Sequence, residues 1–156
     1  MLRTSLLDAG KNMDIFAFNK KCTQICAKLN LPKSFLHRNV NEGMSGGERK
    51  KNELFGMWIL EPSLVIFDEV DSGLDVDALK IVGENIIEYQ KEYNATIIVI
   101  THQEKLIELL SPNHVAIISD GTVVKEGNSA LAYTVLKNGF GDIPGASKLP
   151  GDEKNA

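Results

Sequence analysis

The segment Met44-Ser45-Gly46-Gly47-Glu48 stands at the start of a predicted helix and could bind an anion. Ser45 and Glu48 have the spacing of a capping box, in which the two side chains satisfy the first turn of a helix. Two adjacent glycines are not needed for such a cap, and they cost conformational entropy on folding. A helix start flanked by glycines also exposes backbone N–H groups that suit a phosphate. Two interpretations therefore stay open: a well-capped helix, or a phosphate-binding backbone.

A second group of candidate residues follows two apolar runs. Asp68 and Glu69 come directly after the run 64–67, and His102 comes directly after the run 96–101. In open α/β sheets, ligands bind beyond the carboxyl ends of the strands. There an aspartate could hold Mg²⁺, a glutamate could orient or deprotonate a water, and a neutral histidine could bind a γ-phosphate. The alternative is that the acidic pair merely begins a surface loop.

Hydrophobic patterning predicts the elements that position these residues. We expect helices at 12–30, 45–60, 77–93 and 129–138, strands at 64–67 and 96–101, a connecting loop at 33–43, and a hairpin with arms 114–119 and 122–125 around Asp120-Gly121. Strands without polar alternation are typical of a parallel sheet that is covered on both faces. The order strand, helix, strand agrees with a crossover in such a sheet. The expected class is α/β.

Composition bounds the kind of protein. The net charge of -4 argues against a sequence-independent nucleic-acid interface, which is usually basic. No apolar run approaches the roughly 20 residues that cross a bilayer, and the first residues lack the pattern of a secretory signal. Cys22 and Cys26 lie one helical turn apart, where free cysteines commonly pack as small hydrophobes. We expect a cytoplasmic protein without direct membrane insertion.

The order of these features, with Ser72-Gly73-Leu74-Asp75 shortly after Asp68-Glu69, resembles the ATP-binding cassette (ABC) ATPases. Within that family the chain is similar to the SufC-like ATPases of Suf iron–sulfur cluster assembly. Glu48 favours this branch, because transporter ATPases commonly carry Gln there, and Gly73 favours it because they commonly carry Ala. By this resemblance Met44–Glu48 is the signature loop, and Leu64–Asp68 is the Walker B strand with Asp68 as the metal ligand. Glu69 is the general base and His102 is the switch histidine. The D-loop consists of Ser72, Gly73, Leu74 and Asp75.

One departure from the family matters most. The chain holds no G-x-x-x-x-G-K-[ST] segment, the P-loop whose amides and lysine hold the phosphates. The chain therefore resembles the C-terminal part of such an ATPase, a partial P-loop NTPase fold with a parallel sheet core, a helical subdomain and a C-terminal β-hairpin. We expect a helical signature portion at 1–60, the C-terminal part of the α/β core at 61–139, and a flexible tail at 140–156.

The resemblance also implies ligands and partners. ATP and Mg²⁺ would bind between the P-loop of one subunit and Ser45, Gly46, Gly47 and Glu48 of another, beside Ser72, Gly73 and Asp75. The P-loop would come from a homodimer-like or split-partner ATPase, the scaffold would be of the SufB/SufD type, and the chain alone would have negligible ATPase activity. Two alternatives stay open: the nucleotide-binding subunit of an ABC transporter, and a non-catalytic interaction remnant.

Overall fold

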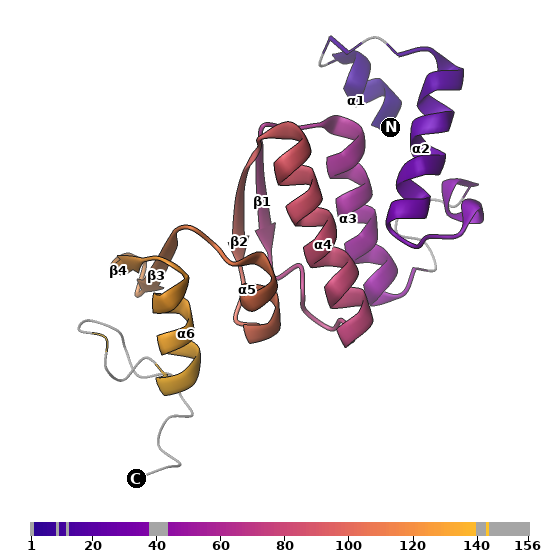
Figure 1. Cartoon of the computed structure of the whole chain (residues 1–156). Coiled ribbons are helices and arrows are strands. Elements are labelled where there is room, and N and C mark those ends of the chain that lie inside the picture. The colour runs from indigo at the N-terminus through magenta and orange to yellow at the C-terminus, as the bar shows by residue number, and fades with distance from the viewer. Residues whose placement is uncertain (1, 9, 12, 38–43, 140–142, 144–156) are drawn as a thin grey trace. The chain divides into compact units, whose positions relative to one another are not determined.

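The computed structural model describes residues 2–8, 10–11, 13–37, 44–139 and 143. The chain divides into two compact units, Met1–Thr101 and His102–Ala156. The first unit contains α1 (Leu2–Asp8), α2 (Ile15–Lys28), the 3₁₀ helix η1 (Lys33–His37), α3 (Gly46–Leu60), β1 (Leu64–Asp68), α4 (Val76–Tyr93) and β2 (Thr96–Ile100) (Figure 1). The second contains α5 (Glu104–Leu110), β3 (Val115–Ser119), β4 (Thr122–Gly127) and α6 (Ser129–Asn138).

The helix predicted at 12–30 is α2, and it is shorter than expected at both ends. Asp14 caps it by accepting hydrogen bonds from the N–H groups of Phe16 and Ala17 at 2.8 and 3.0 Å. Its buried side includes Cys22 and Ile25, as the periodicity predicts, whereas Ile15 is exposed. The following loop was expected to be irregular, but its first part forms η1, and residues 38–43 lie outside the described part of the chain.

An aromatic cluster joins α3 to α4. Trp58, which is 2% exposed, meets Tyr89 edge-on with ring centroids 5.2 Å apart, and Tyr89 stacks on Tyr93 at 4.7 Å. The indole Nε1–H donates to Oδ1 of the buried Asn85 at 3.0 Å. The helical stripes predicted for residues 45–60 and 77–93 therefore face each other, and this contact holds the two helices that support the sheet.

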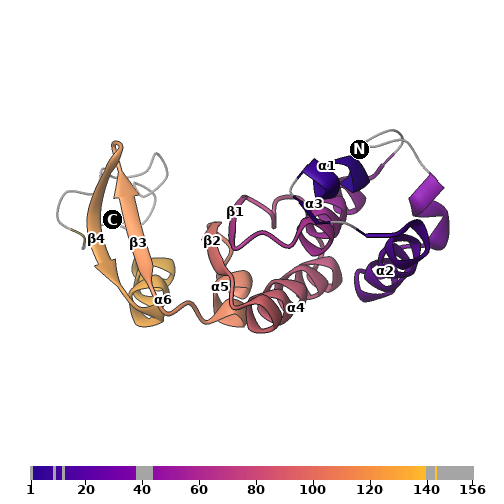
Figure 2. The same ribbon diagram turned by 90° about the horizontal axis from the view of Figure 1, so that it is seen from above.

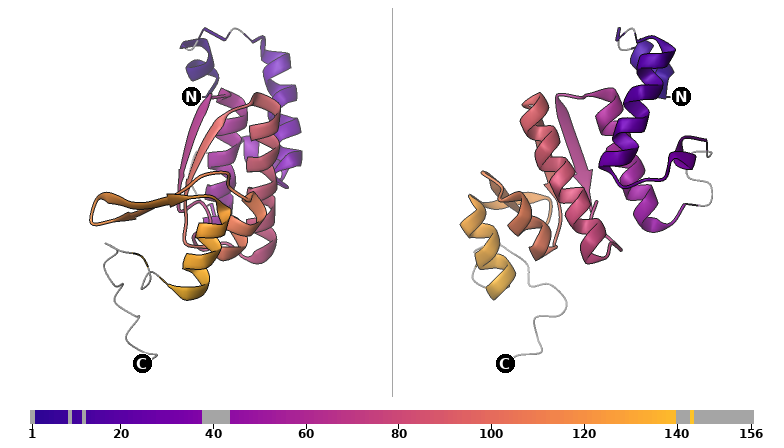
Figure 3. Two further views of the ribbon diagram at one scale, coloured as in Figure 1. Left: turned by 60° about the vertical axis from the view of Figure 1, so that its left-hand side comes forward. Right: turned by 45° about the vertical axis from the view of Figure 1, so that its right-hand side comes forward.

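The two strands of the first unit form a parallel sheet in the register Leu64↔Thr96 to Asp68↔Ile100. Helices α3 and α4 lie over one face of this sheet (Figure 2, Figure 3). On the opposite face four large apolar side chains are 47–60% exposed: Leu64, Ile66, Ile98 and Ile100. The expectation that both faces are buried is wrong for this chain, because its helices cover the side of Phe67 and leave the other side open.

The second unit contains the predicted hairpin. Strands β3 and β4 pair antiparallel, and both turn residues, Asp120 and Gly121, have positive φ (49° and 76°), as a two-residue type I′ turn requires. Helix α6 occupies the predicted range 129–138, whereas the seven-residue α5 was not expected. The predicted tail 140–156 lies outside the described residues except for Ile143, which is buried.

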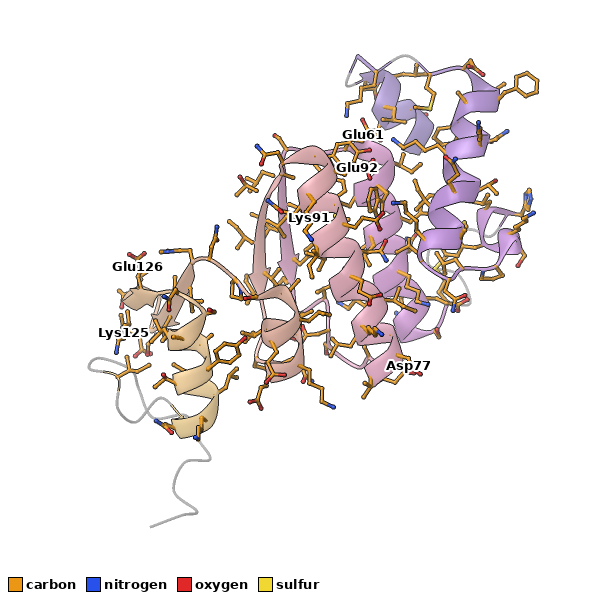
Figure 4. The ribbon with its side chains drawn as sticks, viewed as in Figure 1. Glu61, Asp77, Lys91, Glu92, Lys125 and Glu126 are labelled. Carbon is orange, nitrogen blue, oxygen red and sulfur yellow. The ribbon has the colours of Figure 1, made fainter. Side chains whose placement is uncertain are left out.

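Glu61 connects several helices of the first unit at the C-terminal end of α3 (Figure 4). Its carboxylate accepts from Lys11 Nζ at 3.0 Å and from the Tyr93 hydroxyl at 3.1 Å, and it forms an ion pair with Lys21. Burial alone would raise the pKa of Glu61, but the hydrogen bonds from Lys21 and Lys11 outweigh it and hold that pKa below its ordinary value. The charged carboxylate thus fastens α2, and the segment before it that contains Lys11, to α3 and α4.

Replacing the tryptophan tests the aromatic cluster. We expect Trp58→Phe to lower the free energy of unfolding by about 2–4 kcal/mol, because it leaves a small cavity and deprives buried Asn85 of a donor. Urea unfolding followed by far-UV circular dichroism measures this change. Phe16→Leu, at a side chain that is 83% exposed, should alter the value by less than about 0.5 kcal/mol. Equal effects of the two substitutions would contradict the packing described.

The Glu61 contacts predict a dependence of stability on acid. Because the folded-state pKa is depressed, the stabilisation is present above the ordinary carboxyl pKa and is lost as the pH falls through the folded-state value. Glu61→Gln should cost about 1 kcal/mol at pH 7 and flatten the decline in stability below about pH 5. Glu84→Gln removes an exposed pair with Lys80 and should change little. Parallel acid-unfolding curves for wild type and Glu61→Gln would refute the assignment.

Candidate functional site

Helix α3 begins with the predicted capping box. The Glu48 N–H donates to Ser45 Oγ at 3.2 Å, and the Ser45 N–H donates to Glu48 Oε2 at 3.0 Å. The interpretation of this segment as a well-capped helix is confirmed. It does not exclude anion binding, because the first N–H groups of any helix have no intrahelical acceptors, and the two capping-box hydrogen bonds satisfy the N–H groups of Ser45 and Glu48.

The two glycines at the start of α3 are not required by any contact with the described residues. A Cβ atom built on Gly46 would meet nothing within 4 Å, and one on Gly47 would meet only Leu74 Cδ2, at an ordinary 3.7 Å. Neither glycine has a positive φ. Side chains could therefore be accommodated at both positions in this structure. Because neither glycine carries a side chain, a ligand can approach the backbone at this end of α3.

The carboxyl end of β1 presents the acidic pair to solvent. Asp68 is the last residue of the strand and is exposed. Glu69 is also exposed, with φ of 48°, and its N–H donates to the Ile100 carbonyl at 3.0 Å, which extends the parallel pairing by one hydrogen bond. Both carboxylates thus lie at the edge of the sheet where the sequence predicted them.

A tight loop connects Glu69 to α4. The Ser72 N–H donates to the Glu69 carbonyl at 3.1 Å. Gly73 has φ of 74°, a value that favours glycine, so this glycine has a structural reason of its own. Asp75 caps α4 by accepting from the Ala78 N–H at 2.7 Å. Since Leu74 lies next to Gly47, the structure brings the predicted D-loop beside the predicted signature segment.

His102 is exposed and is the first residue of the second unit. Thr101, the residue before it, closes the first unit and donates a hydrogen bond to Asp71 at 2.8 Å. The role of His102 beside a nucleotide stays a prediction. Asp71 and Thr101 were missed by sequence reasoning, and the one available signal was a third acidic residue so soon after Asp68 and Glu69.

The residues that the structure describes contain no group of three or more His, Cys, Asp or Glu side chains able to hold a metal ion by themselves. Asp68 offers one exposed carboxylate. This arrangement fits Mg²⁺, which usually binds one or two carboxylates together with the phosphates of a nucleotide. Within the same described part of the chain, no helix is long and apolar enough to cross a membrane.

Cys22 and Cys26 do not join this site. Both are buried on α2, and burial raises the pKa of each thiol, with the neighbouring Cys26 adding to the effect at Cys22. A raised pKa disfavours the thiolate, which is the reactive and metal-binding form. Their burial agrees with the expectation that they pack as small hydrophobes.

Comparison with known proteins gives relatives for most of the chain. No protein-family model matches it. It is 41% identical over 130 residues to the probable ATP-dependent transporter slr0075 of Synechocystis, and the aligned region covers 83% of this chain and 50% of that protein. It is 44% identical over 113 residues to the iron–sulfur cluster assembly protein SufC of Plasmodium berghei, covering 72% of this chain and 31% of the relative. The probable ATP-dependent transporter SufC of Escherichia coli is 36% identical over 131 residues, and this match covers 84% of this chain and 52% of the relative.

Solved structures share the fold. The dimeric structure of MJ0796, a bacterial ABC transporter cassette, matches with a TM-score of 0.67 at 18% identity and covers 82% of this chain and 56% of its own. A post-hydrolysis state of the same cassette, bound to ADP and phosphate, matches with the same TM-score of 0.67 and covers 80% of this chain and 54% of its own. The chain thus spans about a third to a half of the length of these curated relatives. Together with its motifs and its fold, they show that the chain belongs to the ABC ATPase family and resembles its SufC-like members.

Proposed function

We propose that this chain supplies the signature-loop half of an ATP-hydrolysing site in a SufC-like ATPase that serves iron–sulfur cluster assembly. The main support for this proposal is that the N-terminus of α3 carries two glycines, whose backbone no side chain of their own covers. Among the described residues Gly46 and Gly47 have no contact that requires glycine, yet both lie in the first turn of a capped helix. A phosphate that contacts this backbone gives a physical reason for them.

The nucleotide needs a second anchor. The 156 residues contain no P-loop, so the amides and the lysine that hold the β- and γ-phosphates lie outside these residues, on another part of the polypeptide or on another chain. The dimeric cassette with the same fold supports a site shared between subunits. In this arrangement Ser45, Gly46, Gly47 and Glu48 close on a γ-phosphate that is held elsewhere. The residues described here then bind ATP poorly by themselves.

The carboxyl edge of the sheet supplies the chemistry. Glu69 orients a water molecule and accepts its proton, while the water oxygen bonds to the γ-phosphorus and the bond to the β–γ bridging oxygen breaks. Asp68 would hold Mg²⁺, directly or through its waters, and the bound ion would neutralise charge on the phosphates. Ser72, Gly73 and Asp75 form the loop beside the signature segment, and His102 hydrogen-bonds the γ-phosphate.

The Suf assignment rests on Glu48, on Gly73 and on relatives that carry the name SufC. In that system hydrolysis would reshape a scaffold of the SufB/SufD type in the cytoplasm. Several relatives are named as probable ATP-dependent transporters, which supports a second candidate, the ATP-binding subunit of a transporter. Retention of a SufB/SufD-type scaffold in a pulldown with the purified chain would favour the first candidate.

Calorimetry with Mg-ATP tests the shared site. We expect no heat of binding for this chain alone, and binding with turnover when it is mixed with a P-loop-containing N-terminal half of a SufC-like protein. Glu69→Gln in the mixture should keep ATP binding but lower kcat by about 100-fold or more, since a positioned general base contributes about 10²–10⁴-fold. Tight binding by the chain alone would contradict the proposal, and so would a mixture that neither binds nor hydrolyses ATP.

A further inference from the structure

Asp71 is a buried carboxylate in the middle of the loop that follows the acidic pair. Its side chain is only 1% exposed, and the preceding Val70 is fully buried. Aspartate is almost never this deeply buried unless it is paired. Asp68, Glu69 and Asp75, the other acidic residues of this segment, are all exposed, so Asp71 differs from them in environment.

The partners of Asp71 are unusually few. Oδ2 accepts one hydrogen bond, from Thr101 Oγ1 at 2.8 Å. Oδ1 is buried and has no donor among the described residues. A buried oxygen without a donor costs free energy, and the cost is larger when the group is charged. Such a group in a native protein calls for an explanation other than stability.

The Asp71–Thr101 hydrogen bond links two segments that meet at the candidate site. Thr101 directly follows β2, whose last residue, Ile100, accepts from the Glu69 N–H at 3.0 Å. Within the loop, the Ser72 N–H donates to the Glu69 carbonyl at 3.1 Å and the Leu74 N–H donates to the Asp71 carbonyl at 3.2 Å. The side-chain bond thus fastens to β2 the same loop whose first residue is Glu69.

We propose that Asp71 is a positioning residue, whose hydrogen bond with Thr101 fixes Glu69 and the loop up to Asp75 at the carboxyl edge of the sheet, and that Asp71 serves this purpose at a cost to stability. The catalytic consequence rests on the proposed function. The structural part does not depend on it, because both residues and the loop belong to the first unit.

Hydrogen exchange on the chain alone tests the structural part. Thr101→Val keeps the shape of the side chain and removes the donor, so the amides of Glu69, Ser72 and Leu74 should exchange about 5–10-fold faster, as expected for the loss of one net hydrogen bond. Thr101→Ser retains the hydroxyl and should restore slow exchange. Thr96→Val, the same change at an exposed threonine of β2, is the matched control. Unchanged exchange in Thr101→Val would overturn the proposal.

Asp71→Asn separates the hydrogen bond to Thr101 from the buried charge. Asparagine keeps an oxygen for Thr101 and removes the buried negative charge, so we expect Tm to stay within about 2 °C of the wild type or to rise. In the mixture with the P-loop partner, Asp71→Asn should keep kcat and the KM for ATP within about 2-fold of the wild type, because the hydrogen bond from Thr101 is retained. Thr101→Val removes this bond and should lower kcat about 10-fold or more while the KM for ATP stays within about 2-fold, because a small displacement of a catalytic group mainly slows the chemical step. Thr101→Ser retains the hydroxyl and should rescue kcat.

The opposite pattern would overturn the proposal. A fall in Tm for Thr101→Val that matches its loss of turnover would make the Asp71–Thr101 bond structural only, and an unchanged kcat for Thr101→Val would remove its role in positioning. A large fall in kcat for Asp71→Asn, which keeps the bond, would also contradict the proposal. A wild-type mixture without turnover would contradict the proposed function instead. In that case the hydrogen-exchange comparison of Thr101→Val with Thr101→Ser still decides whether the bond holds the loop.

Discussion

The parallel pairing of β1 with β2 determines where the candidate residues of the first unit lie. Its register sets Asp68 opposite Ile100, and one further backbone hydrogen bond, from the Glu69 N–H to the Ile100 carbonyl, carries the pairing into the loop. Because the strands run in the same direction, both carboxyl ends reach the same edge. The acidic pair, the Asp71–Thr101 bond and the start of α4 all follow from that alignment.

The same arrangement leaves the sheet incomplete within these residues. Helices α3 and α4 cover one face, and their contact depends on the cluster of Trp58 and Tyr89, whereas the apolar side chains of the other face are exposed. An open apolar sheet favours association with further polypeptide. The chain also spans only part of the length of its relatives and contains no P-loop. Both facts support an ATP site completed by polypeptide beyond these residues.

Local signals in the sequence predicted the main elements well. Ser45 and Glu48 predicted the start of α3, and Asp120-Gly121 predicted the hairpin, because each depends on a few neighbouring residues. Helices α1 and α5 were missed, since seven residues give little periodicity. The burial of Ile66 was predicted wrongly, because an apolar pattern shows that a face can be covered but not whether this chain covers it.

The site was predictable in its list of residues but not in its contacts. The resemblance named the segments at 44–48, 68–69 and 72–75, and the structure brings the first beside the last through Gly47 and Leu74. The resemblance could not reveal the bond between Asp71 and Thr101, because these residues are 30 positions apart and meet only through the pairing of the strands. The open surroundings of Gly46 were equally invisible, because free space is a property of the folded chain.

NMR of the backbone amides of Gly46 and Gly47, in isotopically labelled chain, can show whether the N-terminal end of α3 closes on a bound phosphate. Large chemical-shift changes are expected at these amides only when both Mg-ATP and the P-loop partner are present. Gly121, in the hairpin turn, should stay unchanged as an internal reference. Equal changes with ATP alone, or turnover in the mixture without any change at Gly46 and Gly47, would contradict the claim that this helix end closes on a phosphate held elsewhere.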